Sequence, residues 1–209
     1  MGLTRGLKLY EVGRLSVEET DELMRGFCRR FGLRADGSEP FLAELAAGAE
    51  GWPRHLHFAL QALGEEALAA DGDLGRISWS AAAMRAAESR LRYYRAQQSR
   101  EMKVAAPLIA MALTKMGEQS PRFKLKRLLG KLAAEAPNAS LPDGMTVDSF
   151  YDHLTHRGAL QEREDASVHC PTPSFRSFLI EDGRKALGFE PLRARPPESK
   201  DPDDSPSPF

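Results

Sequence analysis

Residues 51–54 read Gly51-Trp52-Pro53-Arg54 and introduce a helix that is predicted to run to about Ala70. Proline is favoured at the first helical position because an N–H there has no helical partner in any case. Arg54 then falls in the first turn, where backbone N–H groups are free and the helix dipole is positive. Such an end suits an anion, phosphate above all, and arginine adds a planar, permanently charged fork. The stretch therefore predicts an anion-contacting arginine at a helix start.

Three more helices are predicted around this one, within residues 15–100. Ser16 and Glu19 form a capping box, S-x-x-E, that begins the first helix. Ser38 begins a short second helix, and either Ser78 or Ser80 begins a long last helix. The side chains of that last helix expected to face the core are Met84, Ala87, Leu91 and Tyr94. Four helices with short loops predict a small helical domain.

The pattern changes from about residue 101. The predicted elements are, in order, helices near 103–116, 125–132 and 147–157, extended runs at 159–164 and 167–170, and a helix that Ser174 begins. Three helices followed by a two-stranded hairpin is the element order of a winged helix, a relative of the helix-turn-helix. The fold class predicted for the whole chain is mainly α, with one β-hairpin.

The G-x-P-R of residues 51–54 resembles the sensor-2 motif in the lid of AAA+ ATPases, in the branch with a winged helix after the lid. The order of elements supports this resemblance. Residues 157–160 (R-G-A-L) and 173–179 (P-S-F-R-S-F-L) are similar to the closing winged helix of many bacterial AAA-type ATP-binding proteins. Residues 2–5 (G-L-T-R) look like the seam that closes the ATPase core before the lid. The resemblance covers about residues 2–187.

The resemblance implies a division of the chain. Residues 1–14 would be a linker or the end of a missing ATPase core, 15–100 a lid-like helical domain, and 101–188 a winged-helix domain. Residues 189–209 combine prolines with Asp, Glu and Ser, and this composition predicts a disordered acidic tail.

The resemblance also implies a cofactor-binding role for Arg54, Gly51 and Pro53, in which Arg54 would contact the γ-phosphate of ATP. The chain contains no G-x-x-x-x-G-K-[ST] loop and no acidic strand end for magnesium. No catalytic residue is therefore expected in this chain, and ATP and Mg²⁺ are expected only with a P-loop domain. The implied partner is an AAA+ core, in cis or in trans.

A basic cluster lies in the second half of the chain. Six cations stand against one acid between residues 115 and 131, and their positions are Lys115, Arg122, Lys124, Lys126, Arg127 and Lys131. With Arg157 they are candidates for weak, non-specific contact with double-stranded DNA, because lysine and arginine neutralise backbone phosphates. A solvated helix face explains the same pattern. The would-be recognition helix carries Asp148 and Asp152, which suit a major groove poorly.

Two alternatives to the AAA+ interpretation stay open. One is a free-standing winged-helix DNA-binding regulator with a helical dimerisation domain. The other is an adaptor that docks onto a protein partner through its helical surface or its tail.

Composition and residue spacing exclude several further classes of protein and of site. The 209-residue chain is 42% hydrophobic, which is enough for a packed core, and its formal net charge is −1, so it is no bulk polycation. Cys28 and Cys170 form no C-x-x-C spacing, and His153, His156 and His169 lack a metal-binding spacing, so neither a disulfide framework nor a metal site is expected. No apolar run is long enough to span a bilayer. A cytoplasmic protein without membrane contact is expected.

Overall fold

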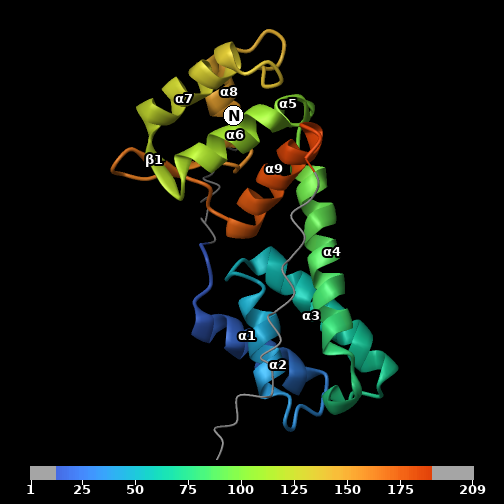
Figure 1. Ribbon diagram of the computed structural model, residues 1–209. Helices are drawn as coiled ribbons and strands as arrows, with labels where there is room; N and C mark the ends of the chain where they lie inside the picture. Colours follow the sequence, from blue (N-terminus) through green and yellow to red (C-terminus); the bar gives the residue numbers. More distant parts are fainter. Residues whose placement is uncertain (1–12, 190–209) are drawn as a thin grey trace, which may run out of the picture. The chain divides into compact units, whose positions relative to one another are not determined.

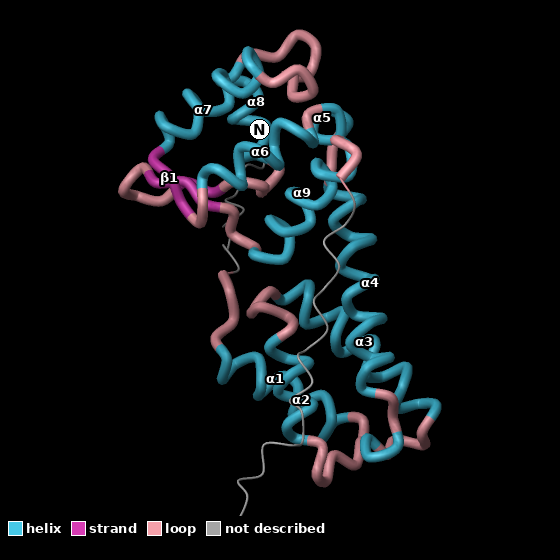
Figure 2. The backbone as a smooth tube through the Cα atoms, in the orientation of Figure 1, coloured by secondary structure: helices cyan, strands magenta, loops and turns pink. Residues whose placement is uncertain are grey.

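The computed structural model describes residues 13–189, and these divide into two compact units that we describe separately. Unit 1 extends to Ser99, and unit 2 begins at Arg100. Both are mainly helical, as predicted, and the strands all lie in unit 2 (Figures 1 and 2). The predicted N-terminal linker (residues 1–14), which includes the ATPase seam, and the predicted acidic tail (residues 189–209) lie outside the described residues, apart from residues 13, 14 and 189.

Unit 1 is a small helical domain. Its elements are α1 (Val17–Arg30), α2 (Glu39–Ala47), α3 (Pro53–Ala69), the 3₁₀ turn η1 (Leu74–Arg76) and α4 (Trp79–Gln97). The capping box that begins α1 is confirmed: the Ser16 hydroxyl accepts from Glu19 N at 3.1 Å, and the Glu19 carboxylate accepts from Ser16 N at 2.7 Å. The predicted start of α3 at Pro53 is also confirmed.

The face of α4 that packs inward differs from the predicted one. Of the predicted core residues Tyr94 is buried, but Met84 and Leu91 are 60% and 39% exposed, and Ala82 and Ala86 are buried in their place. Small alanines allow α4 to lie close along α3, and the larger Met84 and Leu91 are turned towards solvent. The cap is Ser78 rather than Ser80, since its hydroxyl accepts from Ala81 N.

Unit 2 contains five helices and three short strands in its described part. They are α5 (Arg100–Val104), α6 (Ala106–Met116), β1 (Gln119–Pro121), α7 (Arg122–Glu135), α8 (Val147–His156), β2 (Gln161–Glu162), β3 (Ser167–His169) and α9 (Pro173–Ala186). The predicted hairpin is β2–β3, and the strand β1, which was not predicted, pairs antiparallel with the other side of β3. This order is consistent with a winged-helix-like unit.

Two predicted helix boundaries in unit 2 are wrong. The helix expected over 103–116 is divided at Ala105 into α5 and α6. Pro107 lies in the first turn of α6, and a proline there favours the start of a new helix over the continuation of the previous helix. Helix α9 begins at Pro173 after Thr172, so Ser174 lies inside its first turn rather than capping it.

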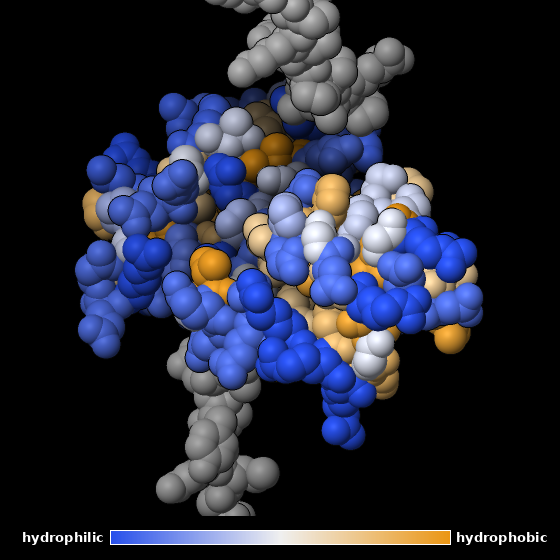
Figure 3. Space-filling view, turned by 90° about the horizontal axis from the view of Figure 1, so that it is seen from below, coloured by the Kyte–Doolittle hydropathy of each residue, from blue (hydrophilic) through white to orange (hydrophobic). Residues whose placement is uncertain are grey.

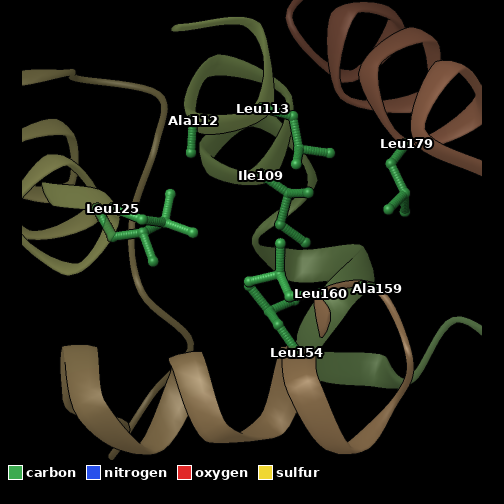
Figure 4. Close-up of a pocket in the computed structure, with 9 residues that line it drawn as sticks. Ile109, Ala112, Leu113, Leu125, Leu154, Ala159, Leu160 and Leu179 are labelled. Atoms are coloured by element: carbon green, nitrogen blue, oxygen red, sulfur yellow. The ribbon is translucent and has the colours of Figure 1, made fainter. Parts of the chain in front are cut away.

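The core of unit 2 is apolar and tightly filled. Side chains from α6, α7, α8 and α9 and from the residues before β2 line one small gap, as Figure 4 shows for Ile109, Leu113, Leu125, Leu154, Leu160 and Leu179. The gap between them is only about 10 Å³ and is lined by carbon, so water has no polar partner there. Helices α6 and α9 cross closely at the buried Gly183. No helix of either unit, within the described residues, could cross a bilayer.

Candidate functional site

The turn before α3 has an unusual backbone. Glu50 and Gly51 are both left-handed, with φ of 55° and 71°. The Gly51 carbonyl accepts a 2.7 Å hydrogen bond from Leu15 N, which ties this turn to the residue before the α1 cap. A Cβ on Gly51 would lie 2.5 Å from the Leu15 carbonyl oxygen. The start of α3 is therefore fixed by a close approach that only glycine permits.

The first turn of α3 has no cap of its own. Trp52 occupies the N-cap position without a side-chain hydrogen bond, and no acidic residue lies in the first turn. The first helical bond runs from Leu56 N to the Trp52 carbonyl. Because Pro53 has no N–H, the amides of Arg54 and His55 remain at the positive end of the helix dipole. This end is electrostatically suited to an anion.

Arg54 is exposed at this end and is held by an aromatic ring. Its guanidinium carbon lies 5.5 Å from the centroid of the Tyr93 ring of α4, and Tyr93 lies 5.9 Å from the ring of Phe58. Within residues 13–189 no carboxylate forms an ion pair with Arg54. The ring orients the guanidinium while its N–H groups stay available for an anion.

A polar pocket of about 270 Å³ lies on the same α3–α4 face as these rings. Its lining residues are Phe58, Gln61, Ala62, Glu65, Arg85, Ser89 and Arg92. Arg85 is paired with Glu65 and Glu66, at 3.3 and 3.2 Å. In the view of Figure 3, hydrophobic residues appear in patches between hydrophilic ones.

His55, directly after Arg54, is a buried polar residue that the sequence analysis missed. Its Nε2 is hydrogen-bonded to the Tyr94 hydroxyl at 2.9 Å, and its Nδ1 lies 4.0 Å from the Glu50 carboxylate. Burial is the main cause that lowers the pKa of His55, and the positive charge of Arg90 lowers it further. A neutral imidazole therefore braces α3 against α4 directly beneath Arg54.

Acidification is expected to destabilise unit 1 through His55. The pKa of the folded-state imidazole lies below its usual 6.5, so the unfolded chain binds more protons in this range. The contribution of neutral His55 to the free energy of unfolding should be fully present above pH 6.5. It should be lost progressively as the pH falls below that value. Urea unfolding followed by tryptophan fluorescence at pH 7.5 and 5.5 measures this. His55→Gln should lose that part of the pH dependence, and an unchanged pH dependence in the variant would contradict the assignment.

The predicted basic cluster of unit 2 is split by the structure. Lys126 donates to the Asp148 carboxylate at 2.6 Å, and Arg122 lies 3.4 Å from the Glu162 carboxylate. Both cations also lie over the Tyr151 ring, at 4.6 and 5.4 Å from its centroid. The Tyr151 hydroxyl donates to Glu162 at 2.6 Å, and burial first, then this carboxylate, raises the tyrosine pKa. Lys126 and Arg122 thus join α7, α8 and β2.

The other predicted cations are exposed. Lys124, Arg127 and Lys131 lie on α7, Lys115 lies in the last turn of α6, and Arg157 follows α8. The exposed residues of the would-be recognition helix α8 include Asp148 and Asp152. Of these exposed cations, only Lys124, Arg127 and Lys131 lie together on one element, α7.

No group of three or more His, Cys, Asp or Glu residues that could hold a metal ion occurs in the described part of the chain. Cys28 and Cys170 are both buried and form no disulfide within the described residues. Burial raises the pKa of the Cys28 thiol, so it is a packing residue on the inner face of α1 rather than a reactive thiolate.

No family model matches the chain, and no curated protein matches it. Among solved structures, the chain is similar to the ORC2 protein of Aeropyrum pernix in its ADPNP–ADP complexes, with 18% identity and a TM-score of 0.47. The similarity covers 84% of this chain and 46% of that one, so this chain spans less than half of the ORC2 protein's length. At this level the similarity assigns neither a family nor an activity.

Proposed function

We propose that unit 1 is the lid of an AAA+ ATP-binding protein and that Arg54 contacts the γ-phosphate of ATP held by a P-loop domain, in cis or in trans. The observation that carries the proposal is the uncapped start of α3, where an exposed arginine without an ion-pair partner in the described residues lies beside two free backbone amides. Unit 2 would transmit the nucleotide state to a DNA or protein partner.

The proposed coupling needs two arrangements of the lid that differ in affinity for ATP and ADP. An arginine that reaches the γ-phosphate favours the ATP-bound arrangement and stabilises charge on the transferring phosphoryl group. Loss of that phosphate after hydrolysis removes the contact. The rigid start of α3, fixed through Gly51 and Leu15, would then move with the whole of unit 1 rather than alone.

Arg54→Ala tests this role in the protein that joins this chain to its P-loop domain. We expect the kcat of ATP hydrolysis to fall about 10²-fold, the loss typical of removing one donor from a transition-state oxyanion. Arg95→Ala, an exposed arginine in the last turn of α4, is the matched control and should hydrolyse ATP normally. Hydrolysis by Arg54→Ala at the parent rate would remove Arg54 from the mechanism.

The cis form of the proposal has a separate test. Sequencing the DNA upstream of the Met1 codon should reveal, in frame, a G-x-x-x-x-G-K-[ST] loop and a later acidic strand end. A stop codon there would end the cis form. The P-loop domain would then be sought as a separate chain that binds this one only in the presence of ATP.

A second candidate function is weak, non-specific DNA binding by unit 2, and the observation that favours it is the row of exposed cations on α7. If two of them contact phosphates, Lys124→Ala with Arg127→Ala should lower the slope of log K against log salt by about 2. Lys126→Ala, whose amine already binds Asp148, should leave that slope unchanged. Fluorescence anisotropy with a labelled duplex between 20 and 200 mM NaCl measures both. No duplex binding at 20 mM NaCl would exclude this function.

A further inference from the structure

The outer face of α7 combines positive charge with an exposed aromatic ring. Phe123, Arg127 and Lys131 follow one another at i+4 spacing, and Lys124 lies beside them, so all four share one side of the helix. Phe123 is 68% exposed. Lys131 forms only an exposed pair with Glu135 at 3.9 Å, which contributes little. No carboxylate pairs with Lys124 or Arg127 within residues 13–189.

We propose that this face of α7 docks residues 198–209 of the same chain. That segment, E-S-K-D-P-D-D-S-P-S-P-F, carries four carboxylates against one lysine and has an aromatic residue, Phe209, after the acids. Its charge complements Lys124, Arg127 and Lys131. The Phe209 ring supplies an apolar partner for Phe123, whose exposure otherwise leaves a large ring in water.

An acidic segment suits this face better than duplex DNA does. Phosphates gain nothing from the Phe123 ring at the N-terminal end of the face. Helix α8 and the β3 strand pack against α7, and their surroundings expose the carboxylates of Asp148, Glu164 and Asp165. A duplex laid across α7 would meet those like charges, whereas a single extended segment could follow α7 alone.

The length of the chain allows the contact. Phe189 and Lys115 line the same surface pocket, so the last described residue of the chain lies close to the end of α6. Lys115 is eight residues before Phe123, which places them at most about 28 Å apart. Residues 190–197 are also eight residues and can span the same distance. Linkage through so short a segment gives an effective concentration in the millimolar range, so even a weak contact would be populated.

The test compares amide ¹H–¹⁵N chemical shifts of the full chain with those of Asp201→Asn, Asp203→Asn and Asp204→Asn combined. We expect the amides of Phe123, Lys124, Arg127 and Lys131 to shift on neutralisation, and 0.5 M NaCl to remove most of the difference because it screens charges beyond a few ångströms. Lys124→Glu with Arg127→Glu should abolish the effect. Arg29→Glu with Arg30→Glu, exposed at the end of α1, is the matched control and should keep it.

Duplex binding provides a second readout that distinguishes residues 198–209 from duplex DNA as the occupant of α7. If the segment covers α7, the triple Asp→Asn variant should bind a 20-bp duplex several-fold more tightly than the parent chain, because the competing carboxylates are gone. A synthetic peptide of residues 198–209 added to a chain ending at Phe189 should shift the same α7 amides, and its Phe209→Ala form should shift them less. Unchanged α7 amides in the triple variant, or equal duplex affinities for variant and parent, would overturn the proposal.

Discussion

Gly183→Ala is expected to destabilise unit 2 by at least about 3 kcal/mol, at the upper end of the overpacking range. A Cβ at this position would overlap the carbonyl oxygen of Ala106 and the Cβ of Ala110, both on α6. Backbone atoms cannot rotate out of the way, so the two helices would have to separate and lose packing along their whole contact. The gain in helix propensity from glycine to alanine, about 1 kcal/mol, is too small to offset this.

Amide hydrogen exchange measures the effect because it reports local opening. Protection of the buried Leu113 on α6 and Leu125 on α7 should fall in Gly183→Ala. The matched control is Gly130→Ala on α7, where an added Cβ meets only the Val147 side chain at 3.5 Å. That variant should be neutral or slightly stabilising. Equal protection in Gly183→Ala and Gly130→Ala would mean that α6 and α9 are not in close contact.

Gly51→Ala is expected to destabilise unit 1 by about 3 kcal/mol, for two separate reasons. A left-handed residue other than glycine costs roughly 1–2 kcal/mol. The added Cβ would also lie 2.5 Å from the Leu15 carbonyl oxygen, which must move away and strain the hydrogen bond from Leu15 N to the Gly51 carbonyl. The start of α3, and Arg54 with it, would be displaced.

Gly37→Ala separates the two costs. Gly37 is also left-handed, with φ of 74°, but nothing lies within 4 Å of its added Cβ. The destabilisation of Gly37→Ala therefore comes from the backbone conformation alone. Urea unfolding with excitation at 295 nm reports unit 1 selectively, since both tryptophans of the chain, Trp52 and Trp79, belong to it. We expect Gly51→Ala to be the less stable of the two. Equal losses would show that the approach of Leu15 carries no cost.

Local signals in the sequence predicted the helices well. The capping box at Ser16 and the helix start at Pro53 depend only on residues within one turn, and both appear in the structure. The hairpin was predicted for the same reason, because its strands follow one another around a short turn.

Long-range contacts account for what the sequence did not predict. Strand β1 is three residues long, ends in Pro121 and pairs with residues 46 to 50 positions later, so no local pattern marks it. The inner face of α4 was assigned from the helical spacing of Met84, Ala87, Leu91 and Tyr94, whereas close packing against α3 buries Ala82 and Ala86. In the same way, the sequence grouped Lys126 and Arg122 with the exposed cations, because the partners that engage them, Asp148, Tyr151 and Glu162, lie on other elements.

The candidate site was predicted in part. The position of Arg54 in the first turn of α3 followed from Pro53, and the structure places it there. Its support by Tyr93, and the buried pair of His55 and Tyr94 beneath it, depend on how α4 lies against α3. The roles of Arg54 in ATP contact and of the α7 cations in DNA contact stay predictions.

The close crossing of α6 and α9 has a consequence for synthesis on the ribosome. Unit 1 has all of its helices once Gln97 has left the exit tunnel. Helix α6 can pack against α9 only after roughly 70 more residues have been synthesised, which takes about 4–14 s at 5–20 residues per second. During that delay the surface of α6 around Ala106 and Ala110, which α9 later covers, has no permanent neighbour. Nascent chains paused before Pro173 should therefore be the ones that recruit chaperones or aggregate.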